Sequence, residues 1–111
     1  MEMRQEELDG GVLKVELDGS FDIAGAADVD MPFSIISGKR NKVLVDFTNV
    51  NFLASMGVRV IVKAAKSMAT HGGKMVVVNP NDAARKVMNA TGLDSIVPVV
   101  DTEAEALASL N

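Results

Sequence analysis

Ser55 is the residue of this sequence best placed for chemistry, because a helical pattern begins beside it. The stretch Val43 to Val62 reads VLVDFTNVNFLASMGVRVIV, which is an apolar strand, a polar loop and an apolar-periodic helix. A helix start presents unpaired N–H groups and a partial positive charge, both of which favour a phosphate attached there. Serine is also a preferred N-cap residue, so a hydroxyl that only caps the helix fits the same pattern. Ser55 is therefore a candidate phosphorylation site with a structural alternative.

A serine hydrolase built from Ser55, His71 and Asp22 is the one enzyme that these residue types allow. The chain has one histidine and no cysteine, and it lacks a P-loop, a GxGxxG and an HExxH motif. Ser55 and His71 are predicted to lie at opposite ends of a helix of about 16 residues, roughly 24 Å long. A catalytic hydrogen bond spans only about 3 Å. We therefore do not expect an enzyme, and no metal or dinucleotide site can be assembled from recognisable parts.

Length and composition predict a single domain over residues 1–111, long enough to fold around its own core. Eleven basic and fifteen acidic side chains give a formal charge of −4, which argues against nucleic acid as a partner. The absence of cysteine excludes disulfides and thiolate sites. No stretch resembles a signal peptide or reaches the roughly 18 apolar residues of a membrane helix. We therefore expect a cytoplasmic protein that does not insert into a membrane.

The hydropathy pattern predicts alternating strands and helices, which is typical of an α/β fold. A hairpin across Leu8 to Gly11 would make the otherwise parallel sheet mixed. The expected strands are Met3–Glu7, Val12–Leu17, Lys42–Phe47, Lys74–Asn79 and Val97–Val100; the expected helices lie within Ala24–Ser37 and over Met56–Thr70, Asp82–Thr91 and Thr102–Leu110.

The first of these helices contains a proline. Pro32 would cost an interior helix about 3 kcal/mol, so we expect the regular helix to begin near Asp30, with Pro32 in its first turn. Residues Asp22 to Val29 would then form a loop or a separate turn. Asp22 itself suits a capping position where the chain leaves the preceding strand.

The helix after Ser55 has the clearest two-sided pattern. Its expected inward side is Val58, Ile61, Val62, Ala65 and Ala69, and its outward side is Arg59, Lys63, Lys66 and Thr70. Such a basic row is usually a solvated face and only weakly indicates a surface for an acidic partner. His71 and Gly72 fit the end of this helix. Asn81 is the expected cap of the next helix, and Gly92 its end.

The segment around Ser55 also carries a family resemblance. Its residues Asp46, Phe47, Thr48, Val50, Phe52, Leu53, Ser55 and Gly57 resemble the phosphorylation-site segment of the STAS family, whose single-domain members are bacterial anti-sigma factor antagonists. Ala54 stands where an aspartate is usual. Three further segments resemble family motifs in the same order, namely Gly19–Asp22, Gly72–Val78 and Asn89–Leu93. The resemblance extends from about Val12 to Leu110.

The resemblance implies a single STAS-type domain, with a mixed sheet of about five strands and about four α-helices. It also implies a protein-interaction switch. The unmodified form would bind an anti-sigma factor, often one with its own serine kinase activity, and phosphorylation of Ser55 would release that partner. A phosphoserine phosphatase would reverse the modification. ATP and magnesium belong to the kinase, so the domain itself would need no cofactor.

The residues expected to line the partner contact lie around Ser55: they are Asp22, Asn51, Phe52, Ala54, Met56 and Gly57. By resemblance Asp22 lies close to the phosphoacceptor, and Gly57 lets a partner backbone approach. Two alternatives have the same fold. One is a STAS subunit docked permanently on a lipid-transport ATPase or a signalling assembly, with Ser55 as a cap; the other is a module that binds a small ligand.

Overall fold

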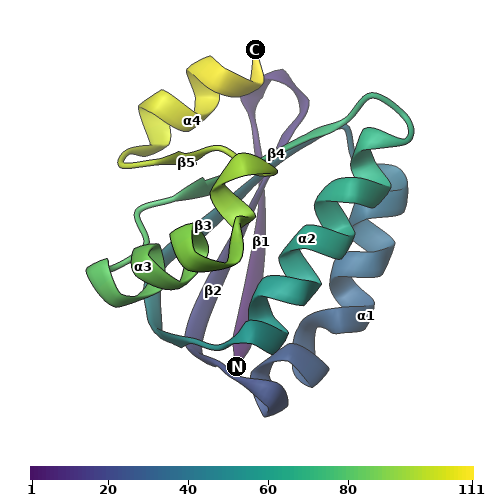
Figure 1. Cartoon of the computed structure of the whole chain (residues 1–111). Coiled ribbons are helices and arrows are strands. Elements are labelled where there is room, and N and C mark those ends of the chain that lie inside the picture. Colours follow the sequence, from purple (N-terminus) through teal and green to yellow (C-terminus); the bar gives the residue numbers. More distant parts are fainter.

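One mixed five-stranded sheet organises the protein. In the computed structural model, which describes residues 1–111, the strands follow one another across the sheet in chain order. β1 is antiparallel to β2, and each later pair is parallel (Figure 1). The strands are β1 (Glu2–Leu8), β2 (Val12–Phe21), β3 (Lys42–Leu53), β4 (Lys74–Val78) and β5 (Val99–Val100). The predicted hairpin at Leu8 to Gly11 is confirmed.

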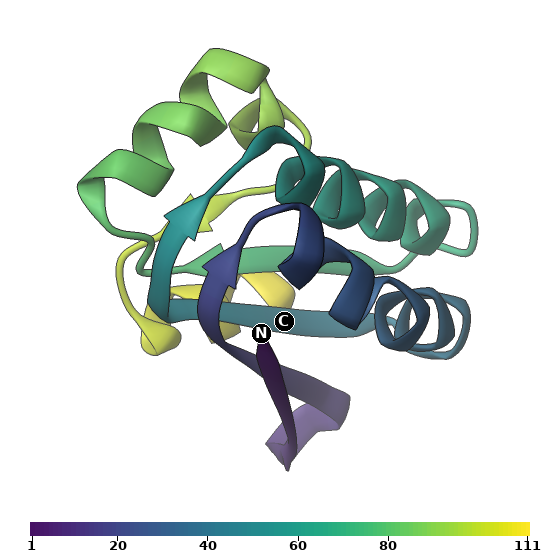
Figure 2. The same ribbon diagram turned by 90° about the horizontal axis from the view of Figure 1, so that it is seen from below.

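Four α-helices cover this sheet. They are α1 (Ile23–Lys39), α2 (Ser55–Ala69), α3 (Asp82–Thr91) and α4 (Glu103–Leu110). The first three share one hydrophobic core with the sheet, whereas α4 packs on the opposite face over a smaller cluster. Figure 2 shows the purple hairpin of β1 and β2 projecting away from the layer formed by α1 and α2. The predicted α/β fold, with a mixed sheet and four helices, is therefore confirmed.

Alternation along the strands explains the two cores. In β4, Met75 and Val77 point to the larger core, and Val76 and Val78 point to the smaller one. In β2, Leu13, Val15 and Leu17 face the larger core, while the residues between them are charged. Successive side chains of a strand point to opposite faces, so one face of β2 is apolar throughout. The other face is left polar beyond the reach of α4.

The first helix differs from its prediction. It begins at Ile23, not near Asp30, and runs unbroken through Pro32 to Lys39. Asp22 is its N-cap, and its side chain accepts a hydrogen bond from the Gly25 N–H at 2.9 Å. The expected loop from Asp22 to Val29 was wrong because the cap starts the helix early and burial of Ala26 and Val29 holds its first two turns.

The buried side of α2 was predicted only in part. Val58 and Ile61 are buried as expected, and the basic residues of the outward row are exposed. Ala69 is exposed instead of buried. The buried row is completed by Gly57, Val60, Ala64 and Met68. The helix is therefore rotated relative to the predicted stripe, so that its smallest residue contacts the sheet.

Strand β3 continues beyond its predicted end at Phe47. It reaches Leu53 because the pairing with β2 absorbs two irregularities, between Glu16 and Asp18 and between Gly19 and Ser20. A bulge lets a strand carry an extra residue while it keeps pairing with its neighbour. The polar stretch that suggested a loop is therefore the end of a bulged strand, and this strand delivers the chain to the start of α2.

Candidate functional site

Ser55 is the first residue of α2 and is exposed to solvent. The residue in the N-cap position is Ala54, whose extended backbone (φ −105°, ψ 169°) and methyl side chain offer no capping oxygen. The alternative in which Ser55 serves as the N-cap was therefore wrong. The structure records no hydrogen bond to the Ser55 hydroxyl, although it records those of other serines. The hydroxyl is thus held at a helix start without being used by the fold.

The backbone at this helix start leaves two donors open. The N–H groups of Gly57 and Val58 both bond to the Ala54 carbonyl, at 3.0 and 3.2 Å. Those of Ser55 and Met56 have no partner within the protein. Because no side chain caps this end, the partial positive charge of the helix faces solvent beside the hydroxyl. An anion attached to Ser55 would find two N–H groups ready to donate to it.

The ends of β2 and β3 place this helix start. The two strands are parallel and pair Phe21 with Leu53, so both chains leave the sheet at the same edge. The Ala54 N–H donates to the Phe21 carbonyl at 2.9 Å, which ties the start of α2 to the end of β2. Asp22 follows Phe21 directly. Its predicted capping role is confirmed, and that role occupies one of its carboxylate oxygens.

Gly57 has a structural role that the sequence did not reveal. It is buried, and a Cβ built on it would lie 2.7 Å from Cγ and 2.8 Å from the carbonyl oxygen of Phe21. The close approach that needs a glycine is therefore made by β2 of the same chain. The expectation that Gly57 admits a partner's backbone is corrected: the residue lets α2 lie tightly against Phe21.

The remaining predicted contact residues surround the helix start. Phe52 exposes 53% of its surface, which is unusual for a side chain of this size. Asn51 is exposed, and its side-chain oxygen accepts a hydrogen bond from the Ser20 hydroxyl at 2.9 Å. Ala54 and Met56 are half-buried. The edge thus combines an apolar ring, a fixed amide and an open hydroxyl.

The structure keeps Ser55 far from His71. Helix α2 runs without a break between them, over 15 residues or about 22 Å. The imidazole of His71 contacts the Ser37 carbonyl at 2.8 Å and the Asn41 side-chain oxygen at 3.1 Å, at the far end of α1. The two side chains therefore cannot act on one substrate atom.

A groove between α1 and α2 begins next to Ser55, and sequence reasoning missed it. It encloses about 280 Å³ and is lined by Ile23, Ala26, Ala27 and Asp30 of α1 and by Met56, Arg59, Val60 and Lys63 of α2. It was missed because the first helix was expected to begin near Asp30, which would leave no wall opposite Met56. The signal that could have found it is the helical spacing of Ile23, Ala26 and Ala27 directly after the capping residue Asp22.

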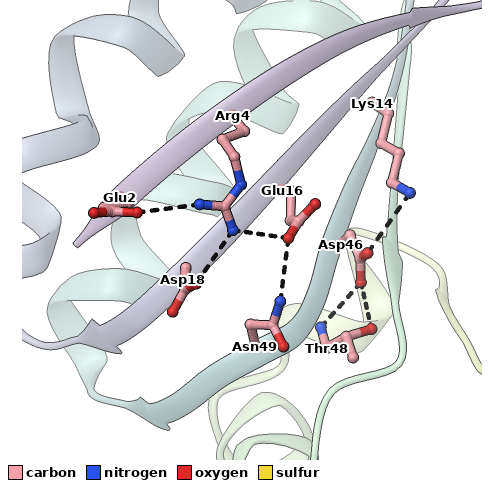
Figure 3. Close-up of polar contacts among 8 residues, drawn as sticks. All are labelled: Glu2, Arg4, Lys14, Glu16, Asp18, Asp46, Thr48 and Asn49. Carbon is pink, nitrogen blue, oxygen red and sulfur yellow. Dashed lines mark hydrogen bonds and ion pairs between the residues drawn. The ribbon is translucent and has the colours of Figure 1, made fainter.

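The uncovered part of the sheet holds a charge network that sequence reasoning also missed (Figure 3). Arg4 donates to Glu16 at 2.8 Å and to Asp18 at 3.2 Å, and the Asn49 amide donates to Glu16 at 3.1 Å. The hydrogen bond from Arg4 holds the pKa of Glu16 below its ordinary value. These charges satisfy one another across β1, β2 and β3, so this face offers a partner little unpaired charge.

The same face continues toward α4. Lys14 lies 2.8 Å from Glu103 and 3.9 Å from Asp46, and its hydrogen bond to Glu103 raises its pKa. No cluster of three or more His, Asp or Glu side chains could hold a metal ion. None of the helices combines the length and the apolar character that crossing a bilayer requires.

Two sequence relatives match this chain, one over part of its length and one over most of it. The TM1081 homolog of Thermotoga neapolitana is 39% identical over 67 residues, which are 60% of this chain and 59% of that protein. This match therefore spans less than two thirds of the relative. The anti-sigma F factor antagonist of Paenibacillus polymyxa is 29% identical over 102 residues, covering 90% of this chain and 87% of that protein.

Solved structures extend the likeness to the whole fold. The crystal structure of TM1081 from Thermotoga maritima superposes with a TM-score of 0.89 at 25% identity, covering 97% of this chain and 93% of that one. The family model of the STAS domain matches residues 4–106, which include most of β1, all of β2 to β5, and α1 to α3 with the open serine at the start of α2. The chain therefore belongs to the STAS domain family.

Proposed function

We propose that this STAS domain is an anti-sigma factor antagonist whose partner binding is switched by phosphorylation of Ser55. The unmodified domain binds an anti-sigma factor, and the phosphorylated domain releases it. The observation that carries the proposal is the exposed Ser55 hydroxyl at an uncapped helix start, with two unpartnered N–H groups beside it. The name of the Paenibacillus polymyxa relative supports the class of partner.

The switch needs no change of fold. A phosphoserine adds about −1.5 to −2 charges at neutral pH. A partner surface shaped around a neutral hydroxyl would have to bury this charge, at a cost of several kcal/mol unless it supplied cations. Each 1.4 kcal/mol changes affinity about tenfold. Even part of that penalty therefore separates a bound state from a free one.

Ala54 adjusts the chemistry of this site. An aspartate in the N-cap position would accept hydrogen bonds from the N–H groups of the first turn and place a negative charge beside the hydroxyl. With Ala54 there, those N–H groups remain available to a phosphate, and no carboxylate repels it. The substitution thus favours the phosphorylated state once it has formed.

The enzymes of the cycle are external to the domain. An anti-sigma factor with serine kinase activity would use its own ATP and magnesium to modify Ser55, and a phosphoserine phosphatase would restore the hydroxyl. The STAS domain contributes the acceptor and the surface around it, which includes Asp22, Asn51, Phe52, Ala54 and Met56. This division of labour requires no cofactor bound to the STAS domain.

The test is phosphorylation with candidate kinases encoded beside the protein, followed by mass spectrometry to locate the phosphate. We expect modification at Ser55, loss of the complex on modification, loss of the complex in Ser55→Asp, and a complex that resists the kinase in Ser55→Ala. Ser95→Ala is the matched control, because Ser95 is also exposed but its hydroxyl donates to the Gly92 carbonyl. A complex that is indifferent to all states of Ser55 would contradict the switch and favour a permanently docked subunit.

A further inference from the structure

Helix α1 presents an apolar row to solvent. Ile23, Met31 and Ile35 expose 71%, 70% and 52% of their surfaces, and Ala27 between them is exposed as well. These positions follow one another at intervals of four, so they line one side of the helix. Three of the five large apolar side chains that the protein exposes lie in this row. A helix that is apolar on its outer side as well as its inner side is typical of one that is covered.

The acidic residues beside this row are already paired. Asp28 lies 2.8 Å from the amino terminus at Met1, and Asp30 lies 2.6 Å from Lys63 of α2. The outer side of α1 therefore shows no unpaired carboxylate. Its exposed surface is apolar or weakly polar along most of its length.

Helix α2, which runs beside α1, carries positive charges on its exposed side. α1 and α2 lie side by side over the same face of the sheet (Figures 1 and 2). Arg59, Lys63 and Lys66 form an exposed row along α2, and neither Arg59 nor Lys66 has an ion-pair partner. Arg59 lines the groove together with Ile23 and Ala27 of α1, and Lys66 lies two turns farther along the same side of α2. Unpaired positive charge therefore begins next to the apolar row, although the whole chain has a formal charge of −4. This local charge is complementary to an acidic partner.

The shape between the two helices favours a protein helix as that partner. The groove of about 280 Å³ has an apolar floor that includes Ala26 and Val60, and Ile23 and Met56 line it as well. Grooves of this kind accept side chains that project from an amphipathic helix, and a few such anchors supply most of the binding energy. A lipid surface would contact the apolar row but would leave the groove unfilled.

We infer that α1 and α2 together form a docking surface for an amphipathic helix whose apolar side is flanked by Asp or Glu residues. The apolar row and the groove receive the apolar side of that helix, and Arg59 and Lys66 pair with its carboxylates. The inference deepens the proposed function and rests on it for one step only, which is release. Met56 lines the groove and follows Ser55 directly, so a phosphate on Ser55 would repel the acidic flank of the docked helix.

Two synthetic helical peptides test the surface directly, because they can share one leucine row and differ only in carrying Glu or Lys flanks. The whole protein, labelled with ¹⁵N, is titrated with each peptide, and amide shifts report the contact. We expect the acidic peptide to shift amides of α1 and α2 and to bind at least tenfold more tightly than the basic one. Equal binding of both peptides, shifts confined to other elements, or no binding at millimolar peptide would overturn the inference.

Charge reversal makes the test specific. The double variant Arg59→Glu with Lys66→Glu should lose the acidic peptide and gain the basic one, whereas Lys86→Glu on α3, an exposed lysine without an ion-pair partner, should behave as the wild type. Met31→Ser, which removes apolar surface without adding charge, should weaken both peptides, and Ile96→Ser, at an apolar residue exposed elsewhere, should not. An unchanged peptide preference in the double variant would contradict the pairing.

Other occupants give distinct results. If Met31→Ser dissociated a dimer in sedimentation, a second copy would cover this face. If the same variant lost binding to anionic lipid vesicles, the face would dock on a membrane. Either result overturns the inference. The peptide titration uses no kinase and no phosphate, so it stands if Ser55 proves unmodified and the proposed function fails. Ser55→Asp weakening only the acidic peptide would support the release step.

Discussion

Gly57 gives the sharpest test of how the site is held in place. Replacing it by alanine adds a Cβ that would lie 2.7 to 2.9 Å from the ring and the carbonyl oxygen of Phe21. Favourable contacts between heavy atoms begin near 3.5 Å, so about 0.7 Å must be gained by moving α2 or β2. Overpacking of this kind costs about 1 to 3 kcal/mol. The better helix propensity of alanine returns about 1 kcal/mol.

Because a backbone carbonyl is among the atoms that would clash, we expect the upper end of this cost. After the propensity gain, Gly57→Ala should lower the free energy of unfolding by about 2 kcal/mol, or the melting temperature by about 8 °C for a chain of this size. Gly38→Ala is the matched control. Gly38 also lies in a helix, but a Cβ there would meet nothing within 4 Å, so the propensity gain should appear alone as a stabilisation of up to about 1 kcal/mol.

The assay is urea unfolding followed by far-UV circular dichroism, with both variants measured against the wild type. The two substitutions should move stability in opposite directions. If Gly57→Ala equalled or exceeded the wild type, then α2 could not lie against Phe21 as described, and the placement of Ser55 derived from that contact would be refuted.

Three further predictions concern the cap, the charges and the far end of α2. Ala54→Asn should stabilise the protein by about 1 kcal/mol in thermal unfolding, because an amide oxygen would cap α2; no gain would mean that the first-turn N–H groups are already satisfied. In Arg4→Gln, the free energy of unfolding should fall less than in the wild type as the pH is lowered into the acid range. Arg4 lowers the pKa of Glu16 in the folded protein, so the stability that this carboxylate contributes is present above its ordinary pKa of 4.5 and is lost as the pH falls through the lowered pKa. Urea unfolding of the wild type and the variant at several pH values checks this, and an equal dependence of stability on pH in both proteins would contradict it. His71→Ala should cost about 1 kcal/mol and speed hydrogen exchange at the end of α1, since it removes contacts to Ser37 and Asn41; unchanged exchange would show that the imidazole does not join the two helices.

Local patterns were enough to predict much of the fold. Helix Asp82–Thr91 was predicted with its observed bounds, because Asn81 caps it through the Ala84 N–H at 2.8 Å and Gly92 ends it at a φ of 78°. The start of α2 was predicted to within one residue, at Met56 instead of Ser55, because an apolar period begins there. Signals of this kind lie within a few residues of the feature that they specify.

The errors came from contacts between distant segments. Pro32 argued against an early start of α1, but the cap at Asp22 and the burial of Val29 outweigh it. The role of Gly57 depends on Phe21, which is 36 positions earlier in the chain and becomes its neighbour only when the sheet forms. The docking groove likewise needs both helices in place. No periodicity within one element can reveal such pairings.

The bulges of β3 have a consequence for how this segment can vary. The Asp46 side chain accepts hydrogen bonds from the Thr48 N–H and hydroxyl, at 2.9 and 2.6 Å, and so supports the first irregularity from within the strand. A deletion or insertion of one residue between Asp46 and Leu53 would interchange the two faces of the strand's end. It would also turn the serine away from the edge where it now stands. The length of this stretch therefore positions Ser55 as strictly as the buried side chains of Phe47, Val50 and Leu53 do.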